Sequence, residues 1–309
     1  MKEKILQLLT QQEGIVSGEQ LSSVLGVSRV SVWKHIRGLQ DAGYPIESHP
    51  KGYRLASSHD ALFAWEFPDR TPNYHYEPET SSTMDVARKL AREGCPHFTV
   101  VAAERQTRGR GRLQRTWYST DGGLYFTVVL RPQLPPMLSF KVNFCASFVL
   151  ARLLRHMFDV PACVKWPNDI LVGDRKICGM LSEMEAETDV VSFVNIGIGL
   201  NVNNAPEADE PRAVSLKSLV GRDVSRKDLL GKFLEAFEDH LKNRMQDDII
   251  ESWKTYTSTL GRPVRIVTVH ETSEGTAVDV DETGALVLQL PDGSLKKIVY
   301  GDCFYRTGE

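Results

Sequence analysis

The segment from residue 104 to residue 117 most constrains how this chain can fold, because it alternates glycine with arginine between two apolar runs. The run FTVVAA at 98–103 and the run LYFTVVL at 124–130 each have the length and the β-branched and aromatic content of a buried strand. An Arg/Gly segment in a low-complexity tail would instead favour a flexible tract that binds nucleic acid. Because this segment joins two core strands, we predict an ordered loop that binds an anion such as a nucleotide.

The loop contains the groups that an anion needs. Gly109 and Gly111 allow backbone conformations closed to other residues and let main-chain N–H groups approach a ligand. Arg110 and Arg112 supply planar, forked cations that suit phosphate or carboxylate. An acyl-phosphate made from a nucleotide is a second ligand that we expect this loop to bind.

Length, charge and cysteine content set the frame. With 309 residues the chain exceeds what one hydrophobic core usually supports, so we expect two or three domains. The formal net charge of −3 gives no general attraction to nucleic acid, so any DNA contact must come from a local basic surface. Five cysteines without C-x-x-C spacing favour reduced thiols over disulfides or a zinc site. The chain has no predicted signal peptide or membrane span, so we expect a soluble, cytoplasmic protein.

Residues 1–60 have a helical pattern of their own. Apolar residues at 5–9 predict a first helix, Ser17 is placed to cap a second, and residues 30–42 predict a third after Gly26. Two short extended pieces around HPKG at 49–52 predict a hairpin with a basic tip, so the whole resembles a winged helix-turn-helix. The side chains expected to contact DNA are Arg29, Ser31, Lys34, His35, Arg37, Lys51 and Arg54. We favour DNA over the alternative of a protein-interaction module.

A linker is predicted from residue 57 to Pro72, and strands then alternate with helices. The hydroxyl-rich run TSSTMD at 80–85 precedes a helix predicted at 86–92. Taken alone, Ser82 or Thr83 would only cap that helix. Together with the Arg/Gly loop, the same hydroxyls and free amides become donors for a small polar ligand.

Two further clusters contain chemistry. The segments VKWPNDI at 164–170 and GDRKICGML at 173–181 predict two strands around a turn, in which Lys165 and Lys176 are candidate cations for a phosphate or carboxylate. Asp169 is a candidate partner for a metal or an ammonium group, and Asn168 shapes the turn. In isolation, Asp174 to Lys176 would be an ordinary charged hairpin tip.

The run VNIGIGLNVN at 194–203 predicts a buried strand whose glycines let a flat ligand or a neighbouring strand come close. Helices are predicted at 227–242 and 247–256. Short strand patterns from 263 to 305 predict a small antiparallel barrel.

Taken in order, the winged helix, Ser-Ser-Thr, Gly-Arg-Gly-Arg, Lys-Trp-Pro-Asn-Asp, Asp-Arg-Lys-Ile-x-Gly, Gly-Ile-Gly-Leu-Asn and the small barrel resemble the bifunctional biotin protein ligases that also repress the biotin operon. The resemblance covers nearly the whole chain. It implies an α+β protein with a winged helix-turn-helix domain at 1–60, a catalytic domain similar to class II aminoacyl-tRNA synthetases at 61–260 and an SH3-like β-barrel at 261–309. It also implies a homodimer formed through the central-domain sheets.

The resemblance implies a two-step reaction that uses ATP, Mg²⁺ and biotin, and it implies a biotin carboxyl carrier protein and operator DNA as partners. The residues that it places at biotin are Ser82, Thr83, Met84, Gln106, Arg110, Gly111, Arg112 and Lys176. Those that it places at ATP or the adenylate are Arg110, Arg112, Trp117, Asn168, Lys176 and Asn201. The expected catalytic residues are Arg110, Arg112, Lys176 and Asp169, and Asp169 is the one candidate contact for a metal.

Two positions depart from the family pattern: Met84 stands where the family usually has asparagine, and Gln114 where it usually has glycine. Neither removes a residue that the chemistry needs. Three alternatives remain open: a monofunctional biotin ligase whose winged helix does not bind DNA, a lipoate or octanoate protein ligase or transferase, and a repressor that only senses a ligand. The winged helix and the Arg/Gly loop speak against the second, and the pairing of that loop with Lys176 speaks against the third.

Overall fold

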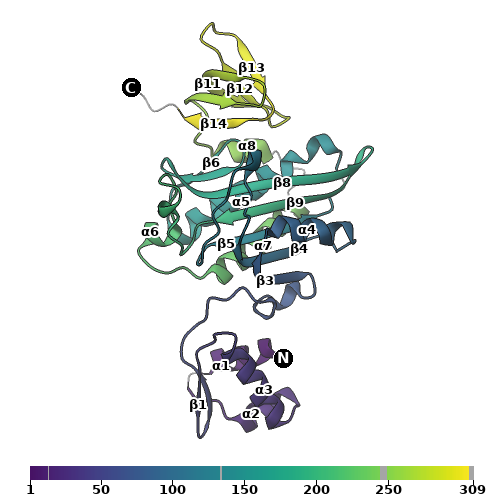
Figure 1. The fold of residues 1–309 in the computed structure, drawn as a ribbon, viewed down its shortest axis with the longest axis vertical. Helices are drawn as coiled ribbons and strands as arrows, with labels where there is room; N and C mark the ends of the chain where they lie inside the picture. Colours follow the sequence, from purple (N-terminus) through teal and green to yellow (C-terminus); the bar gives the residue numbers. More distant parts are fainter. Residues whose placement is uncertain (13, 133, 244–248, 306–309) are drawn as a thin grey trace. The chain divides into compact units, whose positions relative to one another are not determined.

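A computed structural model describes residues 1–12, 14–132, 134–243 and 249–305, without the side chain of Gln114. The chain divides into two compact units, Met1–Thr71 and Pro72–Glu309. Figure 1 shows the helices and strands of each unit. The architecture confirms the predicted α+β class.

The N-terminal unit contains the predicted helix-turn-helix. Its helices are α1 (Lys2–Gln11), α2 (Gly18–Leu25) and α3 (Arg29–Gln40), and its strands β1 (Ile46–His49) and β2 (Gly52–Leu55) form an antiparallel hairpin. The Ser17 hydroxyl caps α2 by accepting a hydrogen bond from the Gln20 amide at 3.0 Å, and Gly26 ends that helix in the left-handed conformation with φ +65°. Helix α3 starts one residue earlier than predicted, because Ser28 caps it, and ends at Gln40 rather than at residue 42.

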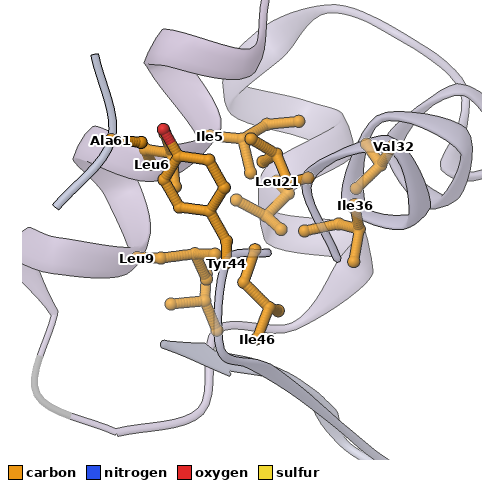
Figure 2. Close-up of a cluster of buried hydrophobic side chains, with 11 residues drawn as sticks. Ile5, Leu6, Leu9, Leu21, Val32, Ile36, Tyr44, Ile46 and Ala61 are labelled. Carbon is orange, nitrogen blue, oxygen red and sulfur yellow. The ribbon is translucent and has the colours of Figure 1, made fainter. Parts of the chain in front are cut away.

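The three helices and the hairpin share one hydrophobic core. Figure 2 shows side chains of all three helices pointing toward one another, with Tyr44 and Ile46 completing the cluster from the start of the hairpin. Ile5, Leu21 and Ile36 are fully buried. The apolar spacing of each helix therefore builds a single core, which leaves the outer face of α3 free.

The segment after residue 60, predicted as a linker, packs on this unit. Ala61 belongs to the hydrophobic core, and Phe63 and Trp65 pack against it. The Trp65 indole N–H donates to the Tyr44 hydroxyl at 2.9 Å. The N-terminal unit therefore extends to Thr71. The domain boundaries that we infer after residues 60 and 260 remain proposals.

The C-terminal unit is built on a seven-stranded sheet of order β3-β4-β5-β9-β8-β7-β6. Strands β3 and β4 are parallel and all other neighbours are antiparallel. The strands are β3 (Tyr74–Thr80), β4 (Thr99–Gln106), β5 (Leu124–Leu130), β6 (Ala162–Lys165), β7 (Asp169–Val172), β8 (Arg175–Glu187) and β9 (Val190–Leu200). The predicted strands at 98–103, 124–130, 173–181 and 194–203 correspond to β4, β5, β8 and β9. The strand predicted at 164–170 is instead divided into β6 and β7 by a turn at 166–168.

Helices cover both faces of the sheet. Thr127 of β5 donates a hydrogen bond to Thr83 of α4 (Thr83–Arg92), whereas its neighbour Phe126 contacts Phe233 of α7 (Arg226–Asn243) edge to face. Successive residues of a strand point to opposite faces, so α4 and α7 lie on opposite sides. The remaining helices are α5 (Phe140–Phe158), α6 (Leu216–Val220) and α8 (Ile249–Lys254). Short 3₁₀ turns are η1 (Ala64–Glu66), η2 (Pro68–Arg70), η3 (Arg112–Gln114), η4 (Pro136–Leu138) and η5 (Pro206–Ala208).

Three predicted helices differ in their bounds. Helix α4 begins at Thr83 rather than at residue 86, because Ser82 is its N-cap and accepts a hydrogen bond from the Met84 amide. Helix α7 agrees with the prediction to within one residue at each end. The predicted helix at 247–256 corresponds to α8, and residues 247 and 248 lie outside the described part.

The stretch Pro136–Phe158, which includes α5, is long and apolar enough by length and composition to cross a membrane. Most of it is buried inside the C-terminal unit, where α5 packs against α7 and α8. The stretch has the burial of a core helix. All five cysteines are free, and burial raises the pKa of Cys303 to about 12.

A second, five-stranded antiparallel sheet of order β13-β12-β11-β10-β14 follows α8. Its strands are β10 (Pro263–Val267), β11 (Thr272–Val280), β12 (Leu286–Gln289), β13 (Leu295–Ile298) and β14 (Asp302–Tyr305). The predicted β-rich C-terminal domain is therefore confirmed. Trp166 ties this sheet to the large one, since its indole N–H donates to the Gly284 carbonyl at 3.1 Å.

Asp281 organises the turn between β11 and β12. Its Oδ1 accepts hydrogen bonds from the Thr283 amide at 2.9 Å and the Ala285 amide at 3.1 Å, and its Oδ2 pairs with Lys297 at 2.8 Å. Partial burial by itself would raise the pKa of Asp281. The hydrogen bonds from Lys297, Thr283 and Ala285 outweigh this effect and lower the pKa to about 2. A lowered pKa stabilises the folded state above the ordinary carboxyl pKa, and this stabilisation is lost as pH falls toward 2.

We expect Asp281→Asn to lower the free energy of unfolding by about 1–2 kcal/mol at neutral pH, because a charged acceptor of several hydrogen bonds is removed. The difference between the variant and the parent should shrink as the pH falls from about 4 toward 2. Urea unfolding at a series of pH values measures both effects. A difference that stays constant down to pH 2 would contradict this role of the carboxylate.

Candidate active site

The fold brings the predicted ligand-binding motifs onto one face of the large sheet. The Arg/Gly segment is the connection between β4 and β5, and Ser82 and Thr83 lie at the start of α4, which covers this face. The other two motifs are the β7–β8 hairpin and strand β9. Segments far apart in the sequence therefore meet over strands β8 and β9, where Trp117 lies against Gly199 and Met84 against Gly197.

The Arg/Gly segment folds back on itself as a tight hairpin. The Trp117 amide donates to the Gly109 carbonyl at 2.9 Å, and the Gly111 amide donates to the Arg115 carbonyl at 2.8 Å. A Cβ on Gly109 would lie 2.3 Å from the Trp117 carbonyl oxygen, so this position requires glycine. Gly111 has room for a Cβ, whose nearest neighbour would be 3.6 Å away.

The expectation that both glycines use conformations closed to other residues is wrong. Gly111 has φ −105°, and the residue with positive φ in this loop is Leu113, at +52°. Gly109 is also absent from the positive-φ glycines. Glycine is needed at position 109 because two backbone segments approach each other closely, and not because of an unusual dihedral angle.

Two carboxylates hold Arg110 of the loop. Arg110 lies 2.8 Å from Asp85 of α4 and 3.5 Å from Glu183 of β8. Its Nε is buried and has no hydrogen-bond partner among the described residues. The guanidinium is thus fixed in place while one donor stays available.

Arg112 and Arg115 reach the small sheet. Both form ion pairs with Asp302 of β14, Arg112 at 3.9 Å, and Arg112 also donates to the Asn168 side chain at 3.4 Å. Burial lowers the pKa of Arg112, although Asp302 and Asp169 oppose this. The small sheet therefore supplies a counter-charge to the loop.

Trp117 lies across a floor of glycines. A Cβ on Gly199 of β9 would be 2.4 Å from the Trp117 ring, and one on Gly179 of β8 would be 3.0 Å from it. The indole Nε1 is buried and has no hydrogen-bond partner in the described part of the chain. The Lys176 ammonium is 5.4 Å from the centre of the ring, within reach of a cation–π contact.

A β-bulge brings Lys176 to this face. Leu171 is paired with Lys176 but Ile170 with Cys178, so Ile177 is an extra residue in β8. In a regular strand Lys176 and Gly179, three residues apart, would point to opposite faces. The bulge puts both on one face, where Lys176 pairs with Asp169 at 2.6 Å.

The β7–β8 hairpin also positions Asn168. Its Nδ2 donates to the Met180 carbonyl, so the side chain holds the turn before β7 against β8. Its Oδ1 is the acceptor for Arg112. Among the described residues no group of three or more His, Cys, Asp or Glu side chains is placed to hold a metal ion. Asp169, the candidate contact for a metal, would therefore supply only one protein ligand. Lys165 lies 5.0 Å from the centre of the Tyr305 ring.

A chain of polar side chains fixes the start of α4. Gln106 Oε1 accepts from the Thr83 amide at 2.8 Å and from its hydroxyl at 3.1 Å, and Gln106 Nε2 donates to Ser119 at 2.9 Å. Ser82 is buried as the helix cap. This network sets the spacing between α4 and the loop.

Met84 and Asn201, also predicted at the site, are buried. Met84 is 3% exposed, and its Sδ lies 2.6 Å from where a Cβ of Gly197 would be, so it covers the floor next to Trp117. Asn201 accepts a hydrogen bond from Asn204 at 3.0 Å. Asn204 in turn accepts from the Val202 amide at 3.0 Å, so the Asn201 side chain orients the residue that holds the backbone after β9.

Sequence reasoning missed the carboxylates that hold the loop. Asp85 lies within the hydroxyl-rich run and directly follows Met84, the last residue of the run that was predicted at the site. Glu183 and Asp302 gave no local signal, because only the folded sheet brings them to the arginines.

In the N-terminal unit, the outer face of α3 presents the predicted basic residues. Arg29, Lys34 and Arg37 are exposed, and Ser31 and His35 are half-buried. Lys51 is exposed at the tip of the hairpin. Arg54 is exposed but paired with Glu47 at 2.6 Å. Bonds from Arg54 and His49 lower the pKa of Glu47, so this carboxylate offsets part of the positive charge of the wing.

Comparison with known proteins agrees with this geometry. Three family models match: an HTH domain at residues 2–54, the biotin/lipoate A/B protein ligase family at 76–203 and the biotin protein ligase C-terminal domain at 259–306. The bifunctional ligase/repressor BirA of Bacillus subtilis is 33% identical over 98% of each chain. The chain belongs to this family. BirA of Escherichia coli is 28% identical, and the matched region covers 99% of this chain and 97% of the E. coli protein.

Solved structures of the family share the fold. A biotin protein ligase from Aquifex aeolicus, in complex with biotin and ATP, has a TM-score of 0.64 and 28% identity, with 77% of this chain and 100% of that chain covered. The Leishmania major ligase with biotinyl-5-AMP has a TM-score of 0.54 and 27% identity, over 74% of this chain and 98% of that one.

The glycine floor generates a prediction for this ligase/repressor. We expect Gly199→Ala to lower the free energy of unfolding by about 1–3 kcal/mol, because the new methyl group must displace the Trp117 ring or the buried strand. Urea unfolding, followed by tryptophan fluorescence, measures the change. Gly111→Ala is the matched control and should stay within about 0.5 kcal/mol of the parent, since its methyl group has room. Equal stability of the two variants would refute the close contact.

Proposed function

We propose that this chain is an ATP-dependent biotin protein ligase and a biotinyl-AMP-dependent repressor of the biotin operon. The observation that supports the ligase most strongly is that Trp117 lies on the glycine floor with Lys176 5.4 Å from its ring, while Arg110 and Arg112 of the same loop are held by Asp85 and Asp302. Such a site offers a flat apolar surface beside several cations. A small acid and a nucleotide phosphate are the reactants that fit it.

In the first step, an oxygen of the biotin carboxylate attacks the α-phosphorus of ATP and pyrophosphate leaves. Negative charge increases on the phosphate oxygens in the transition state. Arg110 and Arg112 are already fixed by their carboxylates and can stabilise that charge without large rearrangement. Lys176, held by Asp169, is placed to orient the carboxylate.

In the second step, the amine of a carrier-protein lysine attacks the carbonyl carbon of the mixed anhydride, and AMP leaves. The carrier lysine arrives as an ammonium group and must lose a proton before it can attack. Asp169 is the carboxylate in position to attract that ammonium group and to accept the proton. The anhydride must also be shielded from water, and we infer that the Arg/Gly hairpin covers it. The expected carrier is the biotin carboxyl carrier protein.

Mg²⁺ fits the site as an ion that enters with ATP. The ion usually keeps several waters and binds through phosphates and one or two carboxylates, and Asp169 is the carboxylate that pairs with Lys176 in the described part of the chain. It would neutralise phosphate charge. The phosphates of ATP would supply most of the ligands of the ion, and the protein would supply Asp169.

The repressor activity follows from the basic face of α3 and the wing. We propose that two chains form a homodimer in the cytoplasm and that biotinyl-AMP favours the dimer, which binds operator DNA. Each chain would then place α3 in the major groove, with Lys51 near the phosphates. The alternative of a monofunctional ligase differs in one respect only, which is that its winged helix does not bind DNA.

The ligase proposal predicts that the chain releases pyrophosphate with ATP and biotin and labels a biotin carrier domain. Arg110→Ala should lose at least about 2 kcal/mol of transition-state stabilisation in adenylate formation. Lys176→Ala should weaken the use of biotin far more than the binding of ATP. Lipoate and octanoate serve as competing substrates, and a preference for either over biotin would replace this proposal with the lipoate ligase alternative.

The repressor proposal predicts adenylate-dependent and salt-dependent binding to DNA upstream of biotin synthesis genes. Glu47→Gln should strengthen this binding and steepen its salt dependence by about one released counterion per subunit, because Arg54 becomes free to contact a phosphate. Fluorescence anisotropy at several salt concentrations measures both. If biotinyl-AMP does not increase DNA binding at low salt, the monofunctional ligase is the better assignment.

A further inference from the structure

Two large apolar side chains are exposed on α3, the helix that carries the basic face of the N-terminal unit. Val30 is 63% exposed and Trp33 is 51% exposed. They are three residues apart in the helix, so they are neighbours on its surface. Figure 2 shows that the core of this unit is instead filled from α3 by Val32 and Ile36. The packing of the unit therefore does not account for Val30 and Trp33, which together form an apolar patch.

A cation holds one side of this apolar patch. The guanidinium of Arg37, one turn after Trp33, lies 5.9 Å from the centre of the Trp33 ring, within reach of a cation–π contact. This contact limits the orientations of the ring at the surface. A side chain that is already ordered loses less conformational entropy when a partner binds. The apolar patch is therefore suited to recognition.

The charges around the apolar patch indicate the class of partner. Arg29, Lys34 and Arg37 are exposed on the same helix, and the sequence of α3 contains neither aspartate nor glutamate. Such a surface attracts a polyanion. An apolar protein surface would cover Val30 and Trp33 but would make no use of the three cations.

The major groove of DNA offers one kind of apolar group. Its base edges present hydrogen-bond donors and acceptors, and the 5-methyl group of thymine is the exception. Val30 and Trp33 lie in the first half of α3, and the N-terminal residues of a recognition helix are the ones that reach base edges. An apolar side chain there gains by burial against a methyl group, whereas burial against a polar edge costs the hydration of that edge.

We propose that Val30 and Trp33 form a base-reading patch that contacts thymine methyl groups in the major groove. This inference rests on the proposed repressor function and adds the choice of sequence to it. Lys34 and Lys51 can hold phosphates of any sequence, and such contacts position the protein without reading bases. The apolar patch distinguishes thymine from the other bases, once in each subunit of the dimer.

The test removes the methyl groups from the DNA. Two duplexes from the region upstream of the biotin synthesis genes are compared, one with thymine and one with deoxyuridine at every thymine position. Uracil pairs as thymine does and lacks only the 5-methyl group. Burial of one methyl group is worth roughly a fourfold gain in affinity, so with two subunits the parent chain and biotinyl-AMP should bind the thymine duplex at least about tenfold more tightly. Fluorescence anisotropy measures both affinities.

Variants assign this preference to the apolar patch. Val30→Thr replaces a methyl group by a hydroxyl of similar shape, and Trp33→Ala removes the ring. The variant with both changes should bind the two duplexes within about threefold of each other, because its methyl contacts are lost. Val24→Ala is the matched control: Val24 is an apolar residue of α2, 61% exposed, and its replacement should keep the parent's preference.

The preference is a ratio measured on one protein, so loss of folded protein cannot change it. If the parent with biotinyl-AMP binds neither duplex, the repressor function fails, and this inference fails with it. If the parent binds both duplexes equally, or the double variant keeps the parent's preference, only the role of the apolar patch is refuted. A double variant that no longer forms a dimer without DNA would show that the apolar patch contacts a second copy of the chain, which would overturn the assignment to DNA.

A second measurement needs no variant. Deoxyuridine is placed at one thymine position at a time, and the affinity of the parent chain is measured for each duplex. Losses confined to a few positions, related by the two-fold symmetry of the binding site, would support direct contact with methyl groups. Equal small losses at every thymine would indicate an effect on the shape of the DNA and would overturn the proposal.

Discussion

The close contact between the Trp117 ring and the backbone of β8 and β9 is the constraint on which the site depends. It is possible only because Gly179 and Gly199 have no side chains. The contact pins the end of the Arg/Gly hairpin to the sheet, and Gly109 lets the other arm of the hairpin lie against Trp117. With both arms fixed, Arg110 and Arg112 can project only toward the few carboxylates within their reach. The positions of Arg110 and Arg112 thus depend on the glycines at 109, 179 and 199, which let the hairpin approach the sheet.

Charge compensation is the second organising feature of the site. Three of the cations expected at the site already have carboxylate partners: Asp85 and Glu183 for Arg110, Asp302 for Arg112, and Asp169 for Lys176. Such partners keep partly buried arginines charged and ordered in the absence of ligand. They also mean that an anion must compete with, or share, each carboxylate. Binding of a doubly charged group therefore depends on several cations acting together, which favours a nucleotide over a simple acid.

Much of the fold could be predicted from the sequence, because the relevant signals are local. Ser17 and Gly26 mark the ends of α2, and the apolar run at 124–130 is β5. The features that the sequence did not predict all depend on distant contacts. The bulge at Ile177 decides which face Lys176 occupies, yet an alternating pattern cannot show an extra residue. Asp302 lies in β14, far along the chain from the arginines that it holds. The segment after residue 60 packs on the core of the N-terminal unit, and its composition alone does not predict that contact.

The pairing of Arg112 and Arg115 with Asp302 has a consequence for biosynthesis. Protein chains are made from the N-terminus, and domains generally fold as units during synthesis. Strand β14, which contains Asp302, pairs with β10 and leaves the ribosome after every other strand that the structure describes. The hairpin that holds the arginines therefore gains this counter-charge from a strand that is made after all strands of the large sheet. A nascent chain can build the large sheet and the glycine floor before β14 is made, so the geometry of the loop depends on the later folding of the small sheet.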